Sequence, residues 1–550
     1  MLKRAIQFFV VTGFFSIVSG EAIIAQNANE INKRPKLIVG IVVDQMRWDY
    51  LYRYYDRYAS NGGFKRLLGQ GFSCENTLIP YVPTYTACGH ASIYTGSVPA
   101  INGITGNEWW DTQLNKPVYC VQDDSVKTVG SNTDLGKMSP RNLTVTSVCD
   151  ELKLATNFRS KVIGFAIKDR GSILPAGHSA DAAYWYDNKT GDWITSSYYM
   201  NSLPQWLTDF NAKKLVDKYY AQGWSTMYPV NTYIQSTDEN KNYATKALGA
   251  RFPYDLKKFV GSNYGVIDVI PSGNTFTFDA AKVALVAEEM GKDSVTDFLA
   301  ISLSSTDYIG HTFGPNSIEA EDCYLRLDKD LGEFLDFLDE KAGKGQYLLF
   351  LSADHGAAHV QGFLKEHNIP TGHTTEETML NDLNKLLKEK YGADNLVSEI
   401  SNFQVVLNHP AFNTLKRKPD DKEVIKVVID YLAKQPGIAR AIDLNDLAAT
   451  TLPAVIKEMI TNGYYPRRSG DVQYFLDPLW LENIPGGGTT HGSWNPYDAH
   501  IPLLWYGWNI KAGKTNRQTY MTDIAPTLSA ILHIQMPSGN IGRVIEEVVK

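Results

Sequence analysis

Seven side chains of the kinds that bind divalent metals or act as nucleophiles are spread over nearly the whole length of this 550-residue chain. They are Asp44, Thr86, Asp307, His311, Asp354, His355 and His491. Mixed carboxylate and imidazole ligands suit zinc best among the common metals. Seven donors suffice for two ions if one group is shared between them. The set therefore predicts a metalloenzyme with a polynuclear site.

The three carboxylates of this set each follow a short apolar run rich in β-branched residues. The runs are LIVGIVV at 37–43, FLAISLSS at 298–305 and YLLFLSA at 347–353. Such runs are typical of strands buried on both faces, as in a parallel sheet. Ligands of open α/β sheets bind beyond the carboxyl ends of the strands. The pattern predicts that three strands deliver metal ligands to one edge of a sheet.

Two pairs in the set have spacings that suit coordination. Asp307 and His311 are one helical turn apart, so a helix would direct both toward one ion. Asp354 and His355 are adjacent, and a turn at a strand end would let them converge. Each pair taken alone is more often an ordinary surface pair. The prediction therefore depends on the combination at strand ends.

Thr86 lies in a polar, Pro-containing segment, PTYTACGH at 83–90, that leads into a predicted helix. The first turn of a helix offers unpaired N–H groups and a positive dipole end, which favour an alkoxide or a bound phosphate. Taken alone, a threonine that simply caps the helix is the commoner interpretation. Metal ions nearby would favour a nucleophile instead.

The elements that must position these residues alternate between strand-like and helix-like patterns after residue 33. Two further strands are predicted by apolar runs at 161–167, which is followed by Lys168, and at 501–505. A helix is predicted at residues 522–534. The alternation predicts an α/β fold with a mostly parallel sheet.

Two stretches interrupt the alternation and are interpreted as insertions. Residues from about 171 to 285 are rich in Tyr, Trp, Asn, Ser and Gly. Residues from about 360 to 485 contain predicted helices at 376–391 and 421–434, which indicate a compact inserted subdomain. With both insertions, residues 33–550 are expected to form the catalytic domain.

Composition and the N-terminus restrict the function classes. The net charge of −7 gives no electrostatic basis for nucleic-acid binding. Residues 1–25 predict a signal peptide, because two basic residues precede a short apolar run and small residues follow it. We expect a periplasmic or secreted protein with no stable membrane association. Five cysteines leave at least one thiol free.

Five motifs together resemble those of the alkaline phosphatase superfamily. They are VVDQMRWD around Asp44, PTYTACGH at 83–90, STDYIGH at 305–311, SADHG at 352–356 and TTHGSW at 489–494. The resemblance covers essentially the whole mature chain and is closest to the exported, phosphate-irrepressible alkaline phosphatases of flavobacteria, the PafA type. It implies a three-layer α/β sandwich with a mostly parallel central sheet and inserted cap segments.

The resemblance also implies residue roles and two Zn²⁺ ions per chain. One ion would be held by Asp307, His311 and His491, and the other by Asp44, Asp354 and His355. Thr86 would touch both ions as the nucleophile, and Asn107, Lys168 and Arg170 would surround the phosphoryl oxygens. The implied activity is hydrolysis of small-molecule phosphate monoesters through a phosphothreonine intermediate, with a broad substrate range and two in-line steps.

Lys168 and Arg170 bear on the choice of substrate, because a monoester dianion carries more charge than a diester. The pair favours a monoesterase over the alternative, a phosphodiesterase or nucleotide pyrophosphatase on the same two-zinc scaffold. A sulfatase is disfavoured, because Cys88 is not part of a C-x-P-x-R motif. A non-catalytic, metal-stabilised binding protein is the third interpretation, and the complete ligand set argues against it.

We expect the protein to be a monomer.

Overall fold

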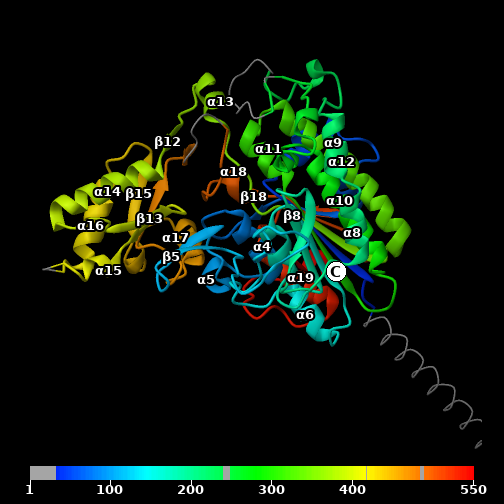
Figure 1. Ribbon diagram of the computed structural model, residues 1–550, viewed down its shortest axis with the longest axis horizontal. Coiled ribbons are helices and arrows are strands. Elements are labelled where there is room, and N and C mark those ends of the chain that lie inside the picture. The colour runs from blue at the N-terminus through cyan, green and yellow to red at the C-terminus, as the bar shows by residue number, and fades with distance from the viewer. Residues whose placement is uncertain (1–32, 239–247, 250, 416–417, 483–487, 550) are drawn as a thin grey trace, which may run out of the picture.

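A ten-stranded sheet forms the centre of the protein (Figure 1). The computed structural model describes residues 33–238, 248–249, 251–415, 418–482 and 488–549. The predicted signal peptide at 1–25 lies outside these residues. The strands are β1 (Leu37–Val43), β2 (Phe72–Cys74), β6 (Thr128–Val129), β7 (Val162–Ala166), β8 (Ala182–Asp187), β9 (Asp192–Ser196), β10 (Asp297–Leu303), β11 (Tyr347–Ser352), β19 (Leu503–Gly507) and β20 (Gly513–Thr515). Their order in the sheet is β20-β2-β19-β11-β1-β10-β7-β8-β9-β6.

The middle of this sheet is parallel, which confirms the predicted fold class. β1 pairs in parallel with β10 and β11, β10 with β7, and β7 with β8. Every residue of β1, β7, β10 and β11 is buried, as expected for strands covered on both faces. Because these four strands run the same way, their carboxyl ends share one edge.

The strand predicted at 501–505 is shifted and antiparallel. Short β18 (His500–Ile501) belongs to a three-stranded sheet, and β19 begins only after Pro502 and pairs antiparallel with β11. Proline lacks the N–H that a ladder needs, so it separates the two strands. The helix predicted at 522–534 is shorter, since α19 spans Ile524–Leu532 after a 3₁₀ turn at Met521–Asp523.

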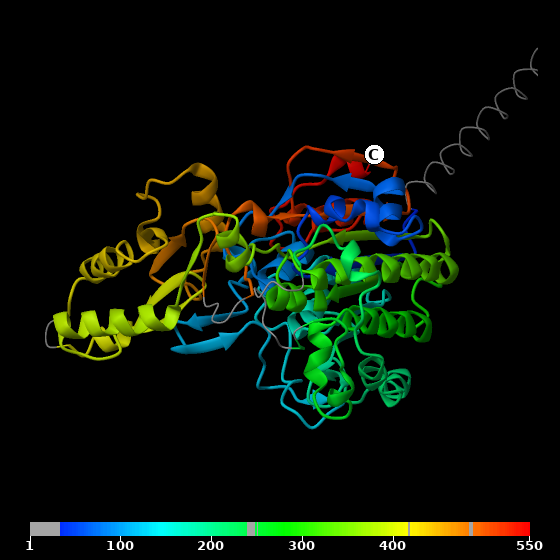
Figure 2. The ribbon, with the colours of Figure 1, turned by 90° about the horizontal axis from the view of Figure 1, so that it is seen from above.

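Helices cover both faces of the sheet, which gives three layers (Figure 2). One layer contains α4 (Thr86–Thr95), α6 (Val148–Ala155), α7 (Asp169–Ala176) and α19, and the other contains α3 (Gly63–Gln70), α8 (Gln205–Ala212), α10 (Ser272–Ala287) and α12 (Ile318–Leu338). Two neighbours in β7 show the division. A Cβ on Gly164 would lie 2.5 Å from the Ser172 carbonyl of α7, whereas Phe165 contacts Trp206 of α8. Neither face of the sheet is open to solvent here.

No described helix combines the length and apolar character that crossing a membrane requires.

Part of the stretch interpreted as an insertion at about 171–285 belongs to the sheet and its helical layer. β8 and β9 extend the central sheet beyond β7, and α10 packs against β10 and β7. Their aromatic residues, Tyr184, Trp185, Tyr186 and Trp193, are buried. These aromatic residues therefore fill the core on both faces of the sheet, since Tyr184, Tyr186 and Trp193 pack on the side of α8 and α10 and Trp185 packs on the side of α7.

A second unit, here called the inserted lobe, comprises the described residues of 372–482. Its sheet has the order β13-β14-β16-β15, with β13 at Val397–Ser401, β14 at Gln404–Leu407, β15 at Ile438–Asp443 and β16 at Val472–Leu476. Helices α14 (Glu376–Tyr391) and α16 (Asp421–Leu432) cover it around a separate hydrophobic core. The lobe stands to one side of the main body (Figures 1 and 2).

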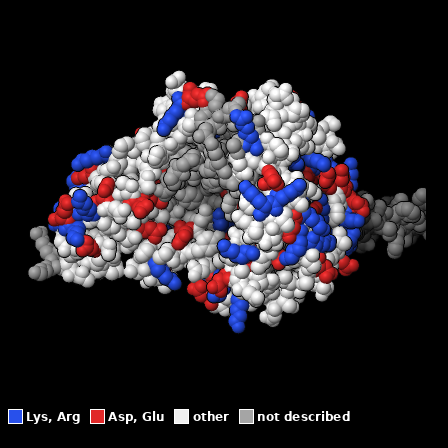
Figure 3. Space-filling model, turned by 45° about the horizontal axis from the view of Figure 1, so that its top comes forward, with Lys and Arg blue, Asp and Glu red and all other residues white. Residues whose placement is uncertain are grey.

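Lys and Arg are interspersed with Asp and Glu over the face in Figure 3.

Candidate active site

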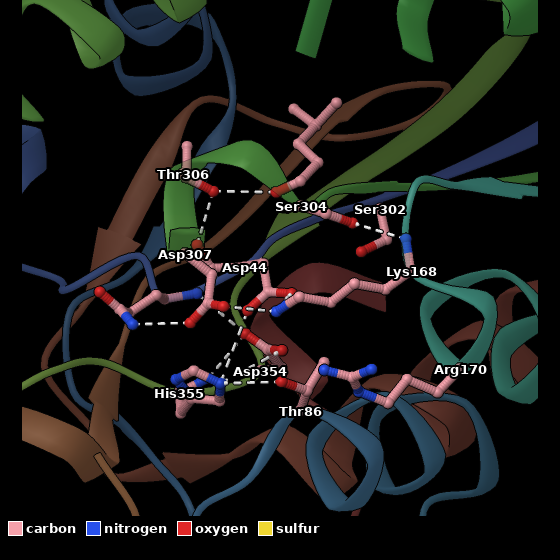
Figure 4. Close-up of polar contacts among 12 residues, drawn as sticks. Asp44, Thr86, Lys168, Arg170, Ser302, Ser304, Thr306, Asp307, Asp354 and His355 are labelled. Carbon is pink, nitrogen blue, oxygen red and sulfur yellow. Dashed lines mark hydrogen bonds and ion pairs between the residues drawn. The ribbon is translucent and has the colours of Figure 1, made fainter. Parts of the chain in front are cut away.

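The predicted site residues meet at the carboxyl edge of the parallel strands (Figure 4). Asp44 follows β1, Asp354 follows β11 and Lys168 follows β7. Helix α11 (Ser305–Phe313) begins shortly after β10 and carries Asp307 and His311 in its first and last turns. His491 comes from the loop that follows the lobe. All three carboxylates are at most 2% exposed, so the edge is a buried pocket of charge.

The three histidines present the same ring nitrogen to the centre of the site. Nδ1 of His311, His355 and His491 faces the carbonyl of Thr489, Gly356 and Thr84 at 2.8, 3.0 and 2.8 Å. A carbonyl only accepts hydrogen bonds, so each Nδ1 carries a proton, which leaves Nε2 as the ring nitrogen available to a metal. This arrangement is the one that fixes metal-binding histidines. Burial lowers the pKa of His355 to about 3, which keeps it neutral.

The buried carboxylates carry more negative charge than the described residues around them compensate. Lys168 Nζ donates to Asp44 Oδ2 at 2.7 Å and to Asp307 Oδ2 at 2.5 Å. Asp44 Oδ1 and Asp354 Oδ2 are buried and accept no hydrogen bond within the described structure. Three carboxylates thus face one ammonium and three imidazoles, and unpaired buried charge is costly. The pocket fits divalent cations.

Two overlapping groups of donors have ligand atoms within 4.8 Å of one another. One contains Asp44, Asp354 and His355, and the other contains Asp307, His355 and His491. The His355 and His491 rings stack with centroids 3.4 Å apart, while His311 Nε2 lies 3.1 Å from Asp307 Oδ1. His355 therefore stands between the two sets of ligands.

Thr86 is the first residue of α4, and Tyr85 is the residue before the helix. Tyr85 is thus the N-cap residue, and its side chain forms no capping hydrogen bond. Thr86 lies one position inside the helix and is not its cap. Instead, Thr86 Oγ1 lies 3.4 Å from His355 Nε2. Thr86 is 1% exposed. A buried hydroxyl at a helix N-terminus and beside candidate metal ligands is suitably placed to become a nucleophile.

Lys168 keeps its charge although it is buried. Burial opposes the ammonium, but the carboxylates of Asp307 and Asp44 outweigh that effect and raise the pKa of Lys168. Its Nζ also lies 4.9 Å from the centre of the Tyr308 ring, a cation–π distance. Lys168 is thus a fixed positive charge between β1 and β10.

Arg170 and Asn107 lie on the Thr86 side of the site. The guanidinium of Arg170 is directed toward Thr86 (Figure 4). Its Nη1 donates to Tyr119 Oη at 3.0 Å, while its buried Nε has no partner in the described structure. Asn107 Oδ1 accepts from the Ala87 N–H at 3.0 Å, which leaves its NH₂ group to donate. Both residues can therefore offer N–H groups to an oxyanion near Thr86.

Two further residues belong to the site and were not assigned a role from the sequence. Gln45, at φ 64°, donates from Nε2 to Asp307 Oδ1 at 2.6 Å and from its backbone N–H to Asp354 Oδ1 at 3.1 Å. His90 contacts the Thr86 carbonyl at 2.9 Å and Ser302 Oγ at 2.8 Å. Both lie within the quoted motifs, and that position is the signal that could have found them.

Close packing holds α4 against the end of β11, and Gly89 makes it possible. A Cβ at Gly89 would lie 2.5 Å from Asp354 Cβ and 2.6 Å from its carbonyl oxygen. We expect Gly89→Ala to destabilise the protein by about 3 kcal/mol, because a backbone must move. The matched control is Gly69→Ala at the exposed end of α3, where a Cβ meets no atom within 4 Å, and a small gain in stability is expected. Urea unfolding measures both, and equal stabilities would contradict the packing argument.

Known proteins resemble this chain over nearly its whole length. The family model for type I phosphodiesterases / nucleotide pyrophosphatases matches residues 38–494. Alkaline phosphatase PhoV of Synechococcus elongatus is 55% identical, over 94% of this chain and 93% of PhoV. A protein of Myroides odoratus named calcium-transporting ATPase is 54% identical, over 95% and 96% of the two chains. Alkaline phosphatase PafA of Elizabethkingia meningoseptica is 49% identical, over 96% of each.

The crystal structure of wild-type PafA has the same fold. It superposes with a TM-score of 0.91 at 48% identity, and the match covers 94% of this chain and 99% of that one. Both the family model and these relatives span the elements that carry the site. The chain belongs to the alkaline phosphatase superfamily, within the type I phosphodiesterase / nucleotide pyrophosphatase family.

Proposed function

We propose that this chain is an exported alkaline phosphatase that hydrolyses small-molecule phosphate monoesters with Thr86 as its nucleophile. The relatives PhoV and PafA are named alkaline phosphatases. The observation that carries the proposal is the buried cation Lys168, held 2.7 Å from Asp44 and 2.5 Å from Asp307 at the edge where Thr86 lies. We further propose that the protein acts as a monomer and has a broad substrate range.

Two Zn²⁺ ions are proposed as the resident metals, because mixed Asp and His donors suit zinc. Asp307, His311 and His491 would hold one ion, and Asp44, Asp354 and His355 the other. When bound, the ions would lower the pKa of the attacking hydroxyl and stabilise charge on the phosphoryl and leaving-group oxygens.

The chain's own residues would then position and stabilise the transferring group. Thr86 Oγ1 gives up its proton and attacks phosphorus in line with the leaving oxygen; the bond from phosphorus to that oxygen breaks, the alcohol or phenol departs and Thr86 becomes phosphorylated. Water then attacks phosphorus in a second in-line step, which breaks the bond to Thr86 Oγ1 and releases inorganic phosphate. Lys168, Arg170 and the Asn107 NH₂ group would meet the non-bridging oxygens, which carry the charge in a phosphoryl-transfer transition state. The buried pocket excludes bulk water, which strengthens these contacts.

A phosphodiesterase or nucleotide pyrophosphatase is the second candidate, because the matching family model carries that description. A diester carries one negative charge fewer on its non-bridging oxygens, so it would interact less strongly with the two cationic side chains, the buried Lys168 and the half-buried Arg170. Lys168 and Arg170 therefore favour the monoester.

Removal and replacement of metal tests the proposed cofactor. We expect a chelator to abolish hydrolysis of an aryl phosphate and to lower the thermal midpoint, since the buried carboxylates then lose compensating charge. Zn²⁺ should restore both, at two ions per chain by elemental analysis. Full activity in protein shown to be metal-free would contradict the proposal.

A further inference from the structure

The hairpin between β13 and β14 of the inserted lobe ends in a two-residue turn with an unusual backbone. Asn402 and Phe403 have φ angles of 56° and 60°, and Ser401 pairs with Gln404 across the turn. Two positive φ values are typical of a type I′ turn, where Gly commonly follows Asn. A bulky side chain rarely adopts this conformation, and such strain tends to persist where function requires it.

The lobe itself holds Phe403 firmly in this conformation. The Phe403 carbonyl accepts hydrogen bonds from the Tyr474 N–H at 2.9 Å and from Gln473 Nε2 at 2.8 Å. Its ring meets the Tyr474 ring edge-on, with centroids 6.1 Å apart, and the residue is 7% exposed. The turn is therefore a rigid tip rather than a free loop.

This tip packs on the neighbours of the proposed nucleophile and of a candidate metal ligand. The Phe403 ring stacks on Tyr85 with an interplanar angle of 15°, and Tyr85 precedes Thr86 in the chain and lies edge-on to His491 at 5.5 Å. A Cβ on Gly492 would lie 2.7 Å from the Phe403 ring and 2.8 Å from that of Tyr85. The two rings thus enclose the backbone that follows His491.

The other residue of the turn contacts the segment that carries Asn107. Asn402 Nδ2 donates to the Glu108 carbonyl at 2.8 Å. A Cβ on Gly106 would lie 2.7 Å from the same Nδ2 atom, so the two segments approach closely. One turn of the lobe therefore contacts the neighbours of Thr86, Asn107 and His491, which come from three separate segments of the main body.

We infer that the Asn402–Phe403 turn is a positioning device through which the inserted lobe sets the geometry of phosphoryl transfer. Phe403 acts through Tyr85 and Gly492 on Thr86 and His491, and Asn402 acts through Glu108 on Asn107. The inference rests on the proposed function. It explains why a phenylalanine occupies a position that glycine would fill with less backbone strain.

Phe403→Gly is the informative variant, because glycine favours this backbone and only the ring is lost. At saturating Zn²⁺ we expect kcat/KM for an aryl phosphate to fall about 10- to 100-fold, because small misplacements of reacting groups cause losses of this size. Inhibition by inorganic phosphate should weaken much less than kcat/KM falls, because Lys168 and Arg170, which would still hold the phosphate oxygens, lie outside the contacts of the Phe403 ring. Phe403→Leu should retain part of the lost rate.

The chain supplies a matched control. Asn157 and Phe158 repeat the same dipeptide with φ angles of 51° and 61°, and Phe158 is 56% exposed. Phe158→Gly should leave kcat/KM unchanged. Equal kcat/KM for Phe403→Gly and Phe158→Gly would overturn the inference. It would also be overturned if Phe403→Gly lost phosphate inhibition as strongly as it lost kcat/KM, because the whole site would then be disordered.

Asn402→Ala tests the second contact independently of Phe403. We expect it to lower kcat/KM severalfold in the wild-type background. It should have little further effect in Asn107→Ala, because substitutions within one chain of contacts do not have additive effects. Full additivity would overturn the role of Asn402. These comparisons are made against an active wild type, so failure of wild-type hydrolysis would instead contradict the proposed function.

Discussion

Thr86→Ala is expected to abolish hydrolysis of an aryl phosphate, with a loss on the order of 10⁵-fold in kcat, the scale seen when a nucleophile is removed. Thr86 Oγ1 is the buried hydroxyl that lies 3.4 Å from His355 Nε2 at the start of α4. Without it, no covalent intermediate can form on the enzyme. Pre-steady-state and steady-state kinetics at saturating Zn²⁺ measure the loss.

The metal content of the same variant separates this role from a structural one. All six Asp and His ligand candidates remain in Thr86→Ala, so we expect it to bind as many ions as the wild type. Thr86→Ser keeps a hydroxyl and should retain much of the rate. Undiminished turnover by Thr86→Ala would remove Thr86 from the mechanism.

Lys168→Ala is expected to lower kcat/KM for an aryl phosphate about 10²- to 10³-fold, as removal of a preorganised donor does. The same variant should lose far less with the corresponding methyl diester, because the diester presents less charge to the ammonium. The ratio of the two kcat/KM values therefore measures the role of Lys168 directly.

Lys153→Ala serves as the control for removing a buried lysine. Its Nζ lies 2.8 Å from Asp181 Oδ1, and its side chain is 4% exposed, but this pair belongs to α6 and the loop before β8, away from the site. We expect lower stability with an unchanged ratio of monoester to diester rates. Equal losses for both substrates in Lys168→Ala would contradict its assignment to the monoester.

The sequence predicted the parallel core well because its signal is local. The apolar run at 37–43 coincides with β1, and the run at 347–353 differs from β11 by one residue. Such strands are buried on both faces, so their composition alone identifies them. Parallel pairing then brings the carboxyl ends of four such strands to one edge, where Asp44, Lys168, Asp307 and Asp354 lie.

Other parts depended on contacts that a single sequence does not reveal. β8 and β9 contain aromatic and polar residues whose burial between the two helical layers appears only in the folded chain. Gln45 donates to Asp307, which is 262 positions away. The turn at Asn402 and Phe403 reaches the main body only because the lobe folds back onto it. Long-range packing, rather than propensity, decides these features.

The ratio of kcat/KM for an aryl phosphate to that for its methyl diester, measured with zinc-loaded wild-type protein, tests the central claim most directly. Two cations beyond the metal ligands, the buried Lys168 and the half-buried Arg170, predict a ratio well above one. The Asp and His donors predict two Zn²⁺ per chain in the same preparation. A ratio below one would contradict the claim, because it would identify the diester as the preferred substrate of this site.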